Sequence, residues 1–106
     1  MIAPIVKKIR KDALKEVFRG FPEKVFIRDS VIVYKGQVPN VALVLVEGAV
    51  FVEDEEFFVK NREEALLVGV RELLDKSIMP SGVTVLEGAK VVILDRETAL
   101  DLQLEG

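Results

Sequence analysis

The sequence predicts a mainly β domain in which antiparallel strands form a sandwich or a roll, with a helix at each end. Three observations support this fold class. The middle of the chain consists of short β-branched runs, and turn residues separate these runs at short intervals. No segment between them fits the crossover helix that neighbouring strands of a parallel sheet need.

The length of 106 residues fits a single domain, 1–106, and a hydrophobic content of 50% is enough for a real core. No apolar run approaches the roughly 18 residues of a membrane span, and basic residues interrupt the N-terminus where a signal peptide would be apolar. We therefore expect a cytoplasmic protein without membrane contact. Charged residues make up 31% of the chain, and Asn and Gln are few. This composition is typical of thermophile proteins, but chance variation in a short chain explains it equally well.

The chain contains no His and no Cys, which removes the commonest metal ligands and the thiol nucleophile. Haem and iron–sulfur clusters would also lack their protein ligands. We expect no metal, no cofactor and no enzymatic activity. Paired carboxylates such as Glu63 and Glu64 are better explained as solvated helix charges than as an acid–base pair.

Residues 1–20 are predicted to form an amphipathic helix, since apolar residues recur at three- and four-residue steps from Ile2 to Phe18. Gly20 and Pro22 would end it. The opposite face is basic. It could dock an acidic partner, an anionic lipid surface or nucleic acid, but a solvated face is the more ordinary explanation.

The predicted β-roll covers residues 24–94. Its strands are expected at residues 24–28, 31–34, 40–46, 49–53 and 57–60, with a closing hairpin of 83–87 and 90–94. Asn61 and Glu64 have the spacing of a capping box, so short helices are expected near 62–67 and 71–76. Asp95 is the predicted N-cap of a C-terminal helix over 95–104.

The most loop-like segment of the second half runs from Glu72 to Val85. A polar loop between strands is where small β domains usually bind ligands. Its two motifs are Arg71-Glu72-Leu73-Leu74-Asp75 and Pro80-Ser81-Gly82-Val83-Thr84-Val85. Two further motifs precede them, Val31-Ile32-Val33-Tyr34-Lys35-Gly36 and Val41-Ala42-Leu43-Val44-Leu45-Val46-Glu47-Gly48.

In their order and spacing these motifs resemble the cyclic nucleotide-binding domain superfamily, the β-roll sensors of catabolite-activator-type regulators and of kinase regulatory subunits. The resemblance covers nearly the whole chain. It implies an antiparallel double-stranded β-helix (a β-roll or jelly roll) with flanking N- and C-terminal helices. It also implies that the later motifs form the phosphate-binding cassette, with ligand-binding residues Arg71, Glu72, Ser81, Gly82 and Thr84.

The chain departs from the family's cassette at two positions. The family has Gly before the cassette Glu and Arg after the cassette Pro, whereas this chain has Arg71 and Ser81. Glu72, the position implied to hold the ribose hydroxyl, is kept. Losing one member of a buried charge pair costs about 2–5 kcal/mol. We therefore expect no sensor-like affinity for cyclic AMP or cyclic GMP, although an inward-pointing Arg71 could bind a smaller anion.

Three classes of function were weighed. The first is a stand-alone regulatory sensor module, and the second is a structural or oligomerisation scaffold without a small ligand. An enzyme of the related cupin type is disfavoured, because such sites hold metal on His. DNA binding in the superfamily comes from an appended helix-turn-helix, so no direct DNA binding is expected. The apolar stripes of the terminal helices suggest a homodimer or a protein partner.

Overall fold

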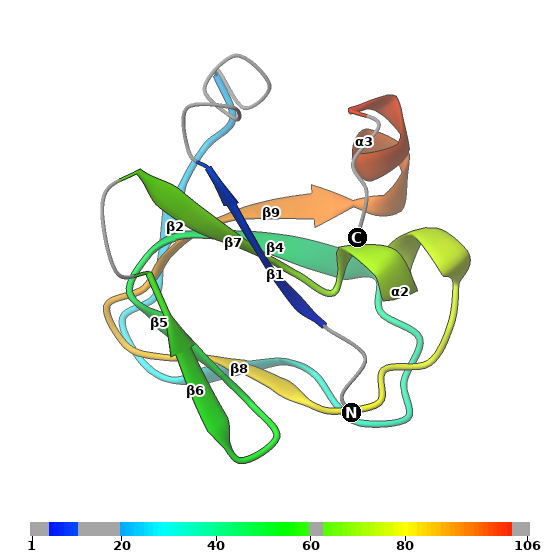
Figure 1. Cartoon of the computed structure of the whole chain (residues 1–106), viewed down its shortest axis with the longest axis horizontal. Coiled ribbons are helices and arrows are strands. Elements are labelled where there is room, and N and C mark those ends of the chain that lie inside the picture. The colour runs from blue at the N-terminus through cyan, green and yellow to red at the C-terminus, as the bar shows by residue number, and fades with distance from the viewer. Residues whose placement is uncertain (1–4, 11–19, 60–62, 103–106) are drawn as a thin grey trace.

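The computed structural model describes residues 5–10, 20–59 and 63–102, and within them the chain is mainly β (Figure 1). The elements, in chain order, are β1 (Val6–Arg10), β2 (Lys24–Val25), β3 (Ser30–Val33), β4 (Val41–Glu47), β5 (Ala49–Val52), β6 (Glu55–Phe58), β7 (Glu64–Val68), α2 (Val70–Asp75), β8 (Val83–Val85), β9 (Lys90–Asp95) and α3 (Arg96–Asp101). The predicted mainly β, antiparallel fold class is confirmed. No helix among the described residues is long and apolar enough to cross a membrane.

Two antiparallel sheets make up the roll. Sheet A has the order β1-β7-β4-β9-β2, and sheet B has the order β3-β8-β5-β6. Strand β4 is apolar along almost its whole length because both of its faces are buried. Leu43 and Leu45 belong to the core between the sheets, whereas Ala42, Val44 and Val46 belong to a second core that includes Val70 and Leu73 of α2 and Ala99 of α3.

A strand occupies part of the segment that was predicted to be the N-terminal helix. Residues 6–10 form β1, which pairs with β7 from Val6↔Val68 to Arg10↔Glu64. The three-residue spacing of Val6 and Ile9 fits a helix, but the backbone pairing offered by the edge of β7 overrides this local preference. The other residues of the predicted helix, 1–4 and 11–19, lie outside the described part of the chain. The predicted homodimer was to form through both terminal helices, but residues 6–10 of the N-terminal one are a strand.

The predicted short helix at 62–67 is also wrong, because residues 64–68 form β7. The run Ala65-Leu66-Leu67-Val68 is buried on both faces, between the two cores. A short continuous apolar run of this kind has no periodicity that separates a strand from a helix. Asn61 of the expected capping box lies outside the described residues, and the second short helix is present as α2.

The predicted closing hairpin is not a hairpin, because β8 pairs within sheet B and β9 pairs within sheet A. The turn at Glu87 and Gly88 instead carries the chain from one sheet to the other. Glu87 N donates to Asp29 Oδ1 at 2.8 Å, and Gly88 N donates to Phe26 O at 2.7 Å. A second crossing joins β4 to β5 at Gly48, and a Cβ there would lie 2.7 Å from Ala89 Cα. These two of the several crossings between the sheets thus touch backbone to backbone.

The predicted N-cap at Asp95 is confirmed, since Asp95 Oδ1 accepts a hydrogen bond from Thr98 N at 2.7 Å. Hydrogen bonds from the Thr98 side chain and then from its backbone N–H lower the pKa of Asp95 below its ordinary value of 3.8. A lowered folded-state pKa gives stability that is present above pH 3.8 and is lost as the pH falls through the folded-state pKa.

We therefore expect Asp95→Asn, which keeps an acceptor but does not titrate, to lose less stability on acidification than the unmodified protein. Urea unfolding midpoints at neutral and at acidic pH measure this difference. Asp54→Asn in the exposed β5–β6 turn is the control. An equal acid sensitivity of Asp95→Asn and the unmodified protein would contradict the linkage.

Candidate functional site

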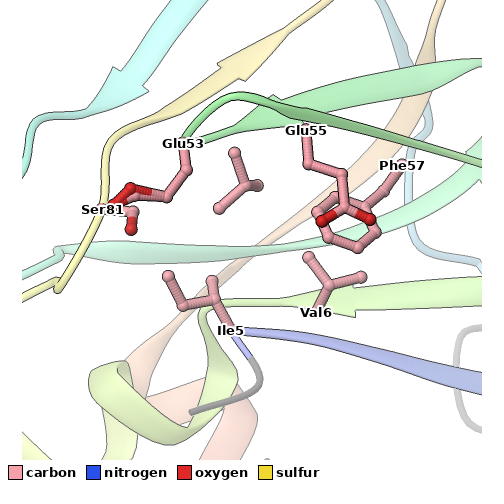
Figure 2. Close-up of a pocket in the computed structure, with 7 residues that line it drawn as sticks. Ile5, Val6, Glu53, Glu55, Phe57 and Ser81 are labelled. Carbon is pink, nitrogen blue, oxygen red and sulfur yellow. The ribbon is translucent and has the colours of Figure 1, made fainter. Parts of the chain in front are cut away.

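A cavity of about 240 Å³ opens between the start of β1 and the β5–β6 hairpin. Its described lining consists of Ile5, Val6, Val52, Glu53, Glu55, Phe57 and Ser81. Figure 2 shows Ile5 and Val6 on one wall and the hairpin residues on the opposite wall, with Ser81 at one end. Glu55 and Phe57 are two positions apart on β6, so both side chains point to the same face of the sheet.

The cavity has an apolar floor and an acidic rim. Ile5 and Val52 are buried, with 5% and 6% of their surface exposed, whereas Glu53 and Glu55 are exposed. No Lys or Arg occurs in the described lining. Two carboxylates beside a low-dielectric wall make the local potential negative. The cavity therefore attracts cations and opposes anions.

Ser81 reaches the cavity because the loop before it is anchored to the β3–β4 connection. Gly36 N donates to Met79 O, and Met79 N donates to Gln37 O, each at 2.8 Å. Met79 fills the core with 1% of its surface exposed. A Cβ on Gly82 would lie 3.3 Å from Val33 O, so the missing side chain allows the loop to run close to β3. Ser81 itself is 5% exposed.

The cassette residues on α2 lie elsewhere. The Arg71 side chain is 59% exposed, and its Nε lies 3.9 Å from Asp75 Oδ2 on the helix surface. Arg71 does not belong to the described cavity lining. Glu72 is buried, its Oε1 has no hydrogen-bond partner among the described residues, and it does not belong to the described cavity lining.

Thr84 lies on the middle position of β8, between the buried core residues Val83 and Val85. Side chains alternate along a strand, so Thr84 faces the outside of sheet B, beside its register partners Val31 and Phe51. Of the five predicted site residues, the structure therefore brings Ser81 alone to the cavity. No group of three or more acidic side chains in the described ranges could hold a metal ion.

The sequence reasoning missed the acidic rim and the apolar walls of this cavity. The signal available was the alternation of Glu53, Glu55 and Phe57 around the β5–β6 turn, which places a carboxylate pair and an aromatic ring on one side of the hairpin. Ile5 and Val6 could not be found, because residues 1–20 were predicted to be a helix.

No protein-family model and no curated protein sequence matches the chain. Solved structures do match it, among them the following two. One is the Thermus thermophilus catabolite activator protein, with 20% identity and a TM-score of 0.60 over 95% of this chain. The other is a cAMP-binding acyltransferase from Mycobacterium smegmatis, with 18% identity and a TM-score of 0.59 over 92% of this chain.

The chain has a cyclic nucleotide-binding-domain-like fold. The resemblance seen in the sequence is thus confirmed at the level of the fold. The chain spans 46% and 32% of the lengths of these two structures, so it corresponds to one part of each.

Proposed function

We propose that the protein is a cyclic-nucleotide-binding-like regulatory module that does not take up cyclic AMP or cyclic GMP in the usual way. The observation that carries this proposal is the acidic rim of the cavity, which Ser81 also lines. In the sequence resemblance, Ser81 corresponds to the family's phosphate-pairing Arg. A buried phosphate loses its water and needs a cation or several aligned N–H groups in return. Ser81 can donate one neutral hydrogen bond, and Glu53 and Glu55 repel the phosphate.

The size of the cavity supports the same proposal. Pockets for drug-sized ligands usually begin at about 300 Å³, and this cavity measures about 240 Å³. A ligand smaller than a nucleotide fits it better. Arg71 could have supplied the missing positive charge, but its side chain lies on the outer surface of α2.

Calorimetric titration of both cyclic nucleotides tests the proposal. We expect no binding at micromolar concentrations by the unmodified protein. A variant that combines Ser81→Arg with Glu53→Gln and Glu55→Gln supplies the cation and removes the repulsion, and it should gain measurable affinity. Arg71→Gly alone is the matched control and should change nothing, because Arg71 does not line the cavity. Micromolar binding by the unmodified protein would refute the proposal.

An oligomerisation scaffold is the second candidate, and one observation favours it. Among the described strands, β1 and β6 each have a single partner, so each leaves one backbone edge open. Strand β1 carries Lys7, Lys8 and Arg10, and β6 carries Glu55 and Glu56. Edges of opposite charge could pair between two copies. A monomer in light scattering at high protein concentration would remove this candidate.

A further inference from the structure

We propose that the cavity binds a small organic ammonium ion, with the apolar part of the ligand on the cavity floor and its ammonium group at the carboxylate rim. This inference rests on the proposed function and gives that module a class of ligand. The ligand charge is opposite to that of a cyclic nucleotide. The polarity of the described lining residues, the size of the cavity and the position of Ser81 support it.

The apolar floor of the cavity determines the size and shape of the apolar part of the ligand. Ile5, Val6, Val52 and Phe57 provide three aliphatic side chains and one aromatic ring. A cavity of about 150 Å³ with a comparable lining is known to hold benzene. The 240 Å³ found here therefore accommodates one six-membered ring with a short side chain. A ring bound in this way removes apolar surface from water on both the ligand and the protein.

The rim sets the charge of the ligand. Neither Glu53 nor Glu55 forms an ion pair with a described residue, whereas Nζ of the nearby Lys8 lies 3.7 Å from Glu64 Oε1. Lys8 does not belong to the cavity lining, but it lines a neighbouring groove of about 310 Å³ together with the rim residue Glu55 and with Phe57. Glu53, which does not line that groove, is therefore the rim carboxylate that is more available to an external cation.

Ser81 completes the polar contacts. An ammonium group donates up to three hydrogen bonds and accepts none. Ser81 and Glu53 both line the cavity, and Figure 2 shows them toward the same end, with Glu55 farther along the rim. The ammonium group would donate to the Glu53 carboxylate and to the Ser81 hydroxyl, and Glu55 would add its negative field. A phosphate at the same place would meet two carboxylates and one hydroxyl.

The test follows the amide signals of the ¹⁵N-labelled protein by NMR while three ligands of similar shape are titrated separately. The ligands are 2-phenylethylammonium chloride, the neutral 2-phenylethanol and the anionic 3-phenylpropanoate. We expect saturable shifts at residues 52–57 and at Ser81. We expect the ammonium ion to bind about five- to thirty-fold more tightly than the alcohol, since exposed carboxylates contribute modestly to pairing. The anion should bind most weakly.

A double variant isolates the rim. Glu53→Gln with Glu55→Gln should reduce the affinity for the ammonium ion to that for the alcohol and leave the alcohol unchanged. Glu23→Gln with Glu87→Gln is the matched control, because both of these side chains are exposed, lie outside the described cavity lining, and change the net charge equally. Equal affinity for alcohol and ammonium ion in the unmodified protein would overturn the inference, as would equal losses in both double variants or an absence of saturable shifts.

The same samples separate this inference from the proposed function. Micromolar binding of a cyclic nucleotide by the unmodified protein overturns the proposed function, whatever the ammonium ion does. Absence of ammonium binding together with absence of nucleotide binding overturns the present inference and leaves the proposed function in place.

Discussion

Replacing Gly48 with alanine should destabilise the protein by about 2–5 kcal/mol. Gly48 has a φ of +90°, a region in which a Cβ costs about 1–2 kcal/mol. The new Cβ would also lie 2.7 Å from Ala89 Cα, at the place where two of the crossings between the sheets touch. Ala89 Cα belongs to the backbone and cannot rotate away, so the strands themselves would have to separate.

Gly88→Ala is the control for this prediction. Gly88 has nearly the same φ, +88°, but no atom lies within 4 Å of the place where its Cβ would be. It should therefore show only the backbone cost of about 1–2 kcal/mol. Urea unfolding of both variants gives the difference. Equal losses of stability would show that the contact with Ala89 relaxes without cost.

Replacing Glu72 with methionine should stabilise the protein by about 1–3 kcal/mol. Glu72 is 6% exposed, and its Oε1 has no hydrogen-bond partner among the described residues. A buried acceptor without a partner keeps the full penalty of its lost hydration. Methionine is unbranched and of similar length, and it fills irregular spaces without adding a polar atom.

Arg71→Met on the same helix is the matched control. The Arg71 side chain is 59% exposed and its ion pair with Asp75 is long, so this change should alter stability by less than about 0.5 kcal/mol. A loss of stability in Glu72→Met would mean that the carboxylate makes a compensating interaction. A gain would place Glu72 among residues that are kept at a cost in stability, which is typical of functional positions.

The sequence was most informative where a residue's local pattern and its tertiary surroundings agree. Strand β4 was predictable because an apolar run closed by Glu47 and Gly48 is also a strand buried on both faces. Asp95 was predictable because capping depends on residues three positions apart. The strand at residues 6–10 was not predictable, since its structure depends on pairing with β7, more than fifty residues away in the chain.

The candidate site shows the same limit. The resemblance led to Ser81, which lies in the cavity, and to Thr84, which faces outward from β8. The rim residues Glu53 and Glu55 are ordinary in sequence, because acidic residues are common in turns. They form a candidate site because the fold places them opposite Ile5 and Val6. The spacing of residues along the chain does not show which surfaces face each other across the roll, because this depends on the tertiary structure.

The position of β9 has a consequence for how the chain is made. In sheet A, β9 lies between β4 and β2, although it is the last of the described strands in chain order. Until residues 90–95 emerge, β4 lacks one neighbour and β2 lacks its partner. Pairings between strands this distant in sequence close large loops and form slowly. Sheet A should therefore be completed only after residues 90–95 have emerged, and until then the nascent chain should expose an apolar strand edge that chaperones can bind.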